Sequence, residues 1–137
     1  MTRVLALDHG SARCGCAVSD PSGTLATPLA VVERPETERG LAALAELVRE
    51  TGAERVIVGL PRSMSGEEGP QAAAARSFAG RVARVVDVPV ELHDERLTTQ
   101  QAQRTGGDAA EDSRAAAHLL DSWLATRRTE PSGNAPT

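Results

Sequence analysis

The sequence contains no lysine, because all 15 of its basic residues are arginine. A Walker A loop uses a lysine to reach the β- and γ-phosphates of a nucleotide, so the chain is not a P-loop NTPase. Aromatic residues are almost absent as well: one phenylalanine, one tryptophan and no tyrosine are present. Binding of single-stranded nucleic acid by stacking bases on aromatic side chains is therefore not expected.

Long hydrophobic runs are also missing. No apolar run approaches the roughly 18–20 residues that a membrane-spanning helix needs, and no signal peptide opens the chain. We therefore expect a cytoplasmic protein with no membrane partner. Its only cysteines, Cys14 and Cys16, do not have zinc-site spacing. On a strand they share a face at a separation that disfavours a disulfide, so we expect buried, reduced thiols, with pairing across a dimer as the alternative.

The length of 137 residues, with 40% hydrophobic and 25% charged residues, is typical of one globular domain. We predict a single domain over residues 1–128. Residues 129–137 contain two prolines and no apolar face, so we predict a disordered C-terminal tail. The net charge of −4 does not by itself indicate a nucleic-acid-binding protein. Bound metal ions can nevertheless reverse the sign of an acidic site.

Strand patterns dominate the N-terminal third. Residues 3–7 form a short apolar run, residues 14–19 form a second, and residues 24–33 supply a third that Pro28 interrupts. Connections this short join antiparallel strands. The N-terminal third therefore predicts three antiparallel strands.

After residue 35 the hydrophobic period changes to that of helices alternating with strands. Helices are predicted over residues 35–52, 71–86, 98–104 and 113–127, and strands over 55–60, stopped by Pro61, and 88–93. The predicted fold is α/β, with a five-stranded mixed sheet of three antiparallel and then two parallel strands, flanked by helices.

Acidic residues stand at three places where such a sheet would bind a ligand. Asp8 follows the first strand, Asp94 and Glu95 follow the fifth, and Asp112 opens the last helix. Converging carboxylates with no lysine nearby repel one another unless a cation joins them. Mg²⁺ and Mn²⁺ prefer such oxygen ligands, so the pattern favours a divalent-metal site.

Each acid also has a purely structural explanation. Asp8 can stabilise the turn after its strand, Asp94 or Glu95 can cap the helix after Thr98, and Asp112 can be an N-cap. The combination of positions, rather than any single residue, favours the cation site.

Four motifs in order carry a family resemblance. They are Asp8–Ala17, Val58–Pro61 followed by Met64 and Gly66, His93–Thr99, and Asp112–Ala116. The first contains the pattern Asp-x-Gly-x-x-Arg followed by Gly-x-Ala, and the third contains Asp-Glu-Arg-Leu-Thr-Thr. Over residues 4–125 the sequence resembles the YqgF/RuvX family.

The resemblance implies a ribonuclease-H-like fold and a metal-dependent nuclease related to Holliday-junction resolvases. It also implies a role in trimming the 5′ end of pre-16S ribosomal RNA. Carried over by position, Asp8, Glu95 and Asp112 are the catalytic acids and would bind two ions, Mg²⁺ or Mn²⁺. Asp94 is a further candidate ligand. Adjacent strand residues face opposite ways, so we expect only one of Asp94 and Glu95 to point inward, and we favour Glu95.

Substrate-binding candidates flank the acids. Arg13 and Arg96 can hold phosphates in bidentate fashion, or form salt bridges at the edge of the core. Gly59 and Gly66 bracket a predicted loop whose backbone can approach nucleic acid closely, or forms an ordinary turn. The segment before Asp112 is acidic, which argues against tight binding of a large substrate.

Three classes of function remain after these considerations. The first is a nuclease acting on structured RNA, and the second a resolvase of branched DNA, which must be a two-fold homodimer to cut two strands symmetrically. The third is a non-catalytic nucleic-acid-binding factor in ribosome assembly. Actin-like ATPases also begin with Asp-x-Gly, but they need two such domains, and this chain has room for one.

Overall fold

A computed structural model of the chain describes residues 2–10, 12–63, 65–96 and 109–129. Its elements, in chain order, are β1 (Val4–His9), β2 (Arg13–Ser19), β3 (Ala26–Pro28), β4 (Val32–Glu33), α1 (Glu38–Thr51), β5 (Arg55–Arg62), α2 (Pro70–Val85), β6 (Val90–Arg96) and α4 (Ala109–Thr129). None of the described helices is long and apolar enough to cross a bilayer.

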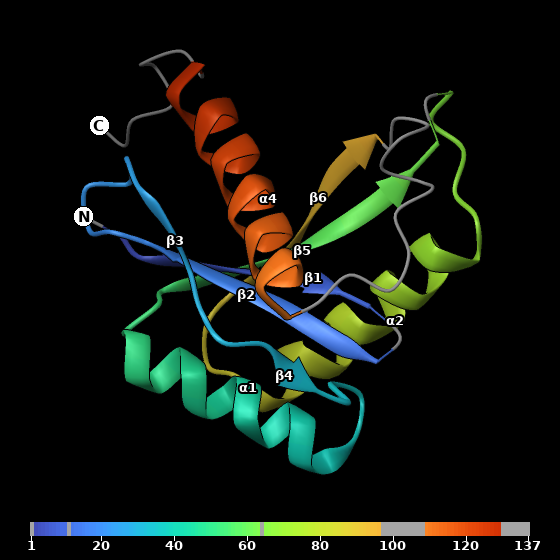
Figure 1. The fold of residues 1–137 in the computed structure, drawn as a ribbon, viewed down its shortest axis with the longest axis horizontal. Helices are drawn as coiled ribbons and strands as arrows, with labels where there is room; N and C mark the ends of the chain where they lie inside the picture. The colour runs from blue at the N-terminus through green and yellow to red at the C-terminus, as the bar shows by residue number, and fades with distance from the viewer. Residues whose placement is uncertain (1, 11, 64, 97–108, 130–137) are drawn as a thin grey trace.

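The strands form one mixed sheet of order β3-β2-β1-β5-β6, with β4 also paired to β2 (Figure 1). β2 is antiparallel to β1, β3 and β4. β5 lies between β1 and β6 and is parallel to both. The predicted mixed sheet of antiparallel and then parallel strands is confirmed.

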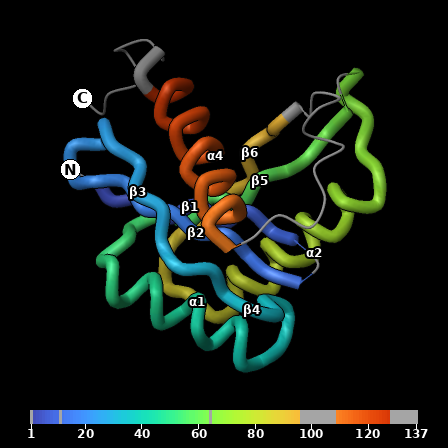
Figure 2. Tube along the Cα trace, viewed as in Figure 1, coloured from blue at the N-terminus to red at the C-terminus, as the bar shows by residue number. Residues whose placement is uncertain are grey.

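Helices cover both faces of this sheet, with α1 and α2 on one face and α4 on the other (Figures 1 and 2). Side chains alternate between the faces along each strand. In β1, Leu5 and Leu7 join the buried cluster that contains Phe78 of α2. Val4 and Ala6 join the cluster formed with α4. We call these two sides of the sheet the α2 face and the α4 face.

Local signals explain where the helices begin and end. Thr37 caps α1, because its Oγ1 accepts a hydrogen bond of 3.0 Å from the Gly40 amide. Gly52 ends the same helix with a left-handed φ of 70°, which glycine adopts without steric cost. Pro70 is the first residue of α2, where its missing N–H leaves no helical bond unmade.

The third predicted strand is in fact two short strands, β3 and β4, on the same edge of β2. Pro28 ends β3, since proline cannot donate to a ladder. The chain resumes pairing at Val32. The sheet therefore has six strands rather than the predicted five.

The predicted stop of β5 at Pro61 is wrong, because the strand continues to Arg62. The residue pairs between β1 and β5 end at Leu7 and Val58, whereas the pairs between β5 and β6 continue through Pro61. Pro61 therefore needs no donor on the β1 side. β6 likewise runs past His93 to Arg96, so Asp94 and Glu95 lie inside the strand.

The last helix begins at Ala109 rather than Ser113, and it includes Thr129, which we had predicted to be in the tail. The predicted helix over residues 98–104 and the rest of the predicted tail, residues 130–137, lie outside the described residues.

Candidate functional site

Asp8 projects toward the α4 face because it continues the even-numbered series of β1. Its neighbour His9 lies on the α2 face. There its ring stacks on Phe78 at a centroid distance of 4.5 Å, and its Nε2 lies 2.9 Å from Glu36 Oε2. His9 therefore packs on the α2 face, while the Asp8 carboxylate lies on the α4 face.

Alternation along β6 separates Asp94 from Glu95. Two residues of the odd series contact α4: Glu91 accepts a 3.0 Å hydrogen bond from Trp123 Nε1, and His93 Nε2 lies 2.9 Å from Ser122 Oγ. Glu95 continues that series, and its Oε2 lies 3.9 Å from the position that a Cβ on Gly59 would take.

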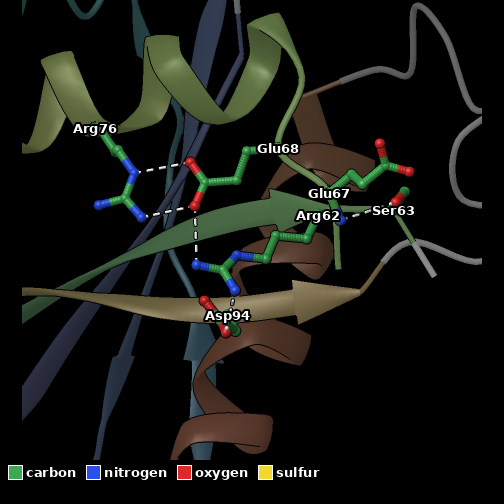
Figure 3. A network of polar contacts seen from close by, with 6 residues as sticks. All are labelled: Arg62, Ser63, Glu67, Glu68, Arg76 and Asp94. Carbon is green, nitrogen blue, oxygen red and sulfur yellow. Dashed lines mark hydrogen bonds and ion pairs between the residues drawn. The ribbon is translucent and has the colours of Figure 1, made fainter. Parts of the chain in front are cut away.

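Asp94 lies on the opposite, α2 face. Its Oδ2 is 3.3 Å from Nη1 of Arg62, and half of its side chain is exposed (Figure 3). The expectation that only one of the two acids faces Asp8 therefore fits this backbone.

Asp112 lies in the first turn of α4, and it is the fourth residue of the helix rather than its N-cap. Gly15 of β2 permits this position. A Cβ on Gly15 would lie only 2.1 Å from the carbonyl oxygen of Asp112, so any other residue would push the helix away. Ser113, whose hydroxyl donates to the Leu29 carbonyl, fastens the same turn to the chain after β3.

Asp8, Glu95 and Asp112 thus come from three elements to one side of the sheet. Asp8 is paired with Gly15, on which the Asp112 backbone packs. Leu7 and Val58 are paired, so the next residues of the two parallel strands, Asp8 and Gly59, lie beside each other. The Glu95 carboxylate lies over Gly59. The two glycines leave the space beside Asp8 free of their own side chains.

This donor set fits a hard divalent cation, because carboxylate oxygens are its preferred ligands. Among the described residues, no three His, Cys, Asp or Glu side chains are already gathered closely enough to hold a metal ion. A cation bridging the three acids would therefore draw their side chains together. The Arg13 guanidinium now balances one of them, with Nε 2.8 Å from Asp112 Oδ2.

Arg13→Gln is expected to tighten Mn²⁺ binding by about tenfold, or about 1.4 kcal/mol. The reason is that the substitution removes a positive charge from a carboxylate that the cation needs. Isothermal titration calorimetry with Mn²⁺ measures the change. Arg49→Gln, which breaks the exposed Arg49–Glu46 pair on α1, is the matched control. An unchanged or weaker Mn²⁺ affinity in Arg13→Gln would show that Arg13 does not compete with the ion.

The other predicted substrate-binding residues lie apart from one another. Gly59 is inside β5 rather than in a loop, and a Cβ there would lie 3.2 Å from Leu119 Cδ2. The missing side chain of Gly59 therefore lets Leu119 of α4 pack closely on β5. Gly66 lies in the loop after β5 with a φ of 92°, a conformation that suits glycine. Arg96 ends β6 beside Arg62, and its side chain lies outside what the structure describes.

Sequence reasoning missed a set of ion pairs at the ends of β5 and β6, shown in Figure 3. Glu68 Oε2 lies 2.9 Å from Arg62 Nη2 and 2.7 Å from Arg76 Nη2. Arg62 also contacts Asp94, as described above. Extending the alternation of β5 past Pro61 would have placed Arg62 on the α2 face. No sequence spacing marked its partners, because Glu68 lies on a loop and Asp94 on another strand.

The two arginines lower the pKa of Glu68 to about 2, chiefly through the hydrogen bonds and charge of Arg76. A lowered folded-state pKa stabilises the fold above the usual carboxyl pKa of 4.5, and that contribution is lost as the pH falls from 4.5 toward 2. The difference in unfolding free energy between the natural chain and Glu68→Gln should therefore shrink across this window. Urea unfolding at a series of pH values measures it, and a difference independent of pH would contradict the assignment.

The cysteines are buried and free. The pKa of the Cys14 thiol is raised by its hydrogen bond with Cys16, by burial and by the nearby carboxylates of Asp8 and Asp112. Cys14 is thus held as a thiol rather than as a nucleophilic thiolate. The prediction that both thiols are buried is confirmed.

His93 of β6 is engaged in packing against α4 through its contact with Ser122. Burial lowers its pKa, although the charges of Asp94 and Glu91 act in the opposite direction.

Comparison with known structures places this fold beside a resolvase. The chain is similar to the Thermus thermophilus RuvC in complex with a Holliday junction substrate, with a TM-score of 0.59 and 18% identity, over 94% of this chain and 97% of that one. The free Thermus thermophilus RuvC gives a TM-score of 0.58. At this identity the likeness concerns the fold, and it confirms the ribonuclease-H-like architecture.

Sequence comparison gives nearer relatives. A protein of Mycobacterium ulcerans assigned as a pre-16S rRNA nuclease is 45% identical, over 97% of this chain and 84% of that protein. One of a Nocardioides species with the same assignment is 47% identical, over 96% of this chain and 92% of its own. The family model described as "RuvX: Holliday junction resolvase" matches residues 2–126. The chain therefore belongs to the RuvX family.

Proposed function

We propose that this protein is a divalent-metal-dependent nuclease that hydrolyses phosphodiester bonds. The observation that carries the proposal is that Asp8, Glu95 and Asp112, from β1, β6 and α4, lie on the same face of the sheet, the α4 face. The membership in a family described as resolvases supports the same chemistry.

Asp8, Glu95 and Asp112 would hold the ions, Mg²⁺ or Mn²⁺, of which two are expected. When bound, such ions activate a water for attack and stabilise the leaving oxygen of the phosphodiester. The rigid strands β1 and β6 fix two of the carboxylates, and the contact of α4 with Gly15 fixes the third. Arg13, beside Asp112, is placed to orient a substrate phosphate once a cation takes over its partner.

The proposed substrate is structured RNA, specifically the 5′ end of pre-16S ribosomal RNA. Support comes from the assignments of relatives that are 45% and 47% identical over nearly the whole chain. We propose the cytoplasm as the location, since ribosomal RNA precursors are made there and the two free cysteines suit a reducing compartment.

Branched DNA is the second candidate substrate, because the matching family is described as Holliday junction resolvases. This activity needs a two-fold homodimer that presents two sites to two strands. Sedimentation of the chain with and without a four-way junction tests this requirement, and a monomer under both conditions counts against the resolvase.

The deciding experiment compares cleavage of labelled pre-16S rRNA and a labelled four-way DNA junction side by side. Each substrate is incubated with Mn²⁺, Mg²⁺ or EDTA and with the natural chain or Asp8→Asn. We expect metal-dependent cleavage of the RNA that the substitution removes. Cleavage of the junction alone would select the resolvase. If both proteins are inert on both substrates, the nuclease proposal fails, and a non-catalytic role in ribosome assembly takes its place.

A further inference from the structure

A cluster of charged side chains lies at the carboxyl ends of β5 and β6, on the α2 face. Its members, Arg62, Glu68, Arg76 and Asp94, are named here the arginine cluster (Figure 3). Glu68 is its centre. Arg76 donates to both of its carboxylate oxygens, with Nε 2.9 Å from Oε1 and Nη2 2.7 Å from Oε2, and Arg62 Nη2 lies 2.9 Å from Oε2.

Two guanidinium groups that converge on one oxyanion form the arrangement by which proteins bind phosphate. Here a carboxylate of the same chain occupies the place of the phosphate. A phosphate group offers more acceptor oxygens than a carboxylate does. Among the described residues, the buried Nε of Arg62 has no hydrogen-bond partner, so the cluster has donating capacity that Glu68 does not use.

The cluster borders the proposed nuclease site. Asp94 precedes Glu95 in β6, and Arg62 is level with Arg96 at the end of the sheet. A nucleic-acid strand that passes from Glu95 around the ends of β5 and β6 to the α2 face would reach the cluster. The cluster is also accessible, since the Arg76 and Glu68 side chains are 48% and 31% exposed.

We propose that Arg62 and Arg76 form a binding site for a backbone phosphate of nucleic acid, and that Glu68 occupies this site in the free protein. The class of ligand rests on the proposed function. Displacement of Glu68 by the substrate frees both guanidinium groups from Glu68 and leaves Asp94, among the described residues, as the one carboxylate beside Arg62. The substrate phosphate thus competes with Glu68 for the two arginines, and this competition lowers the affinity for nucleic acid.

The direction in which removal of the Glu68 charge changes the affinity for nucleic acid tests this proposal. Removing a carboxylate that merely holds the loop in place should weaken binding of nucleic acid, whereas removing a competitor should tighten it. Glu68→Gln is compared with Glu46→Gln, which makes the same change of charge in an exposed Arg–Glu pair on α1. Fluorescence anisotropy in EDTA measures binding of a pre-16S rRNA fragment and of a four-way DNA junction, without cleavage. Circular dichroism verifies that every variant is folded.

We expect Glu68→Gln to bind about five to ten times more tightly than Glu46→Gln at low salt, which corresponds to about one additional phosphate contact. Arg76→Gln should bind correspondingly more weakly than Arg49→Gln, its matched control on α1, with a shallower salt dependence. Tighter binding of either nucleic acid by Glu68→Gln supports the site, and the nucleic acid that is bound more tightly is the source of the phosphate. The proposal is overturned if Glu68→Gln binds no more tightly than Glu46→Gln, or if no variant binds either substrate.

These outcomes are separate from those of the cleavage assay. If the protein cleaves neither substrate but Glu68→Gln binds nucleic acid more tightly, the phosphate site is supported and the nuclease proposal fails. If the protein cleaves in a metal-dependent way but Glu68→Gln binds no more tightly, the nuclease proposal is supported and the phosphate site is overturned.

Discussion

Glu95→Gln is expected to lower the rate of metal-dependent cleavage by at least about a hundredfold, because several kcal/mol of metal stabilisation are lost with the carboxylate charge. Asp94→Asn, one residue away, should leave the rate within about fivefold, since an exposed ion pair contributes only about 0–1 kcal/mol. The two substitutions have the same chemistry, and they differ in the face of β6 on which they lie. Single-turnover rates on the better substrate measure both.

The pair of variants also tests the assignment of faces. Glu95 reaches over Gly59 toward Asp8, whereas Asp94 contacts Arg62 on the α2 face. If Asp94→Asn were as damaging as Glu95→Gln, the carboxylates could not be divided between the faces as described. Equal, small effects of both substitutions would remove Glu95 from the catalytic centre.

Gly15→Ala should destabilise the fold by about 2–3 kcal/mol and also reduce cleavage. The added methyl group would lie 2.1 Å from the Asp112 carbonyl oxygen, and a backbone atom cannot step aside without moving the first turn of α4. Since that turn carries Asp112, the displacement would affect the proposed catalytic carboxylate as well as the packing. Urea unfolding and single-turnover cleavage measure the two effects.

Gly80→Ala is the matched control, because a Cβ at Gly80 in α2 has no atom within 4 Å. It should stabilise the fold by about 0.5–1 kcal/mol through the better helix propensity of alanine. Normal stability of Gly15→Ala would mean that α4 packs on β2 less closely than described.

The spacing of apolar residues along the sequence predicted the strands and the helix that carry this site. The apolar run before Asp8 predicted a buried strand, and strand alternation predicted that Asp94 and Glu95 lie on opposite faces of the sheet. Leu119 and Trp123, one helical turn apart in the last helix, are both buried against the sheet. These predictions succeeded because burial of apolar side chains follows local periodicity directly.

The remaining features depend on contacts between distant segments, which local periodicity does not encode. Pro61 was taken as the end of β5, but its missing donor matters only where a neighbouring strand requires it. The position of α4 depends on the close approach of Asp112 to Gly15, 97 positions earlier in the sequence. The arginine cluster assembles from two strands, a loop and a helix, so its members have no common period.

The most direct test of the metal centre is Mn²⁺ binding to the full chain, followed by electron paramagnetic resonance of the free ion, in the natural protein and in Asp8→Asn. Asp8 is the acid that lies beside both glycines, so its carboxylate is the hardest to replace. We predict saturable binding in the natural chain and its loss in Asp8→Asn, with Asp94→Asn unaffected. Undiminished Mn²⁺ binding by Asp8→Asn would contradict the assignment of Asp8, Glu95 and Asp112 as the metal-binding acids.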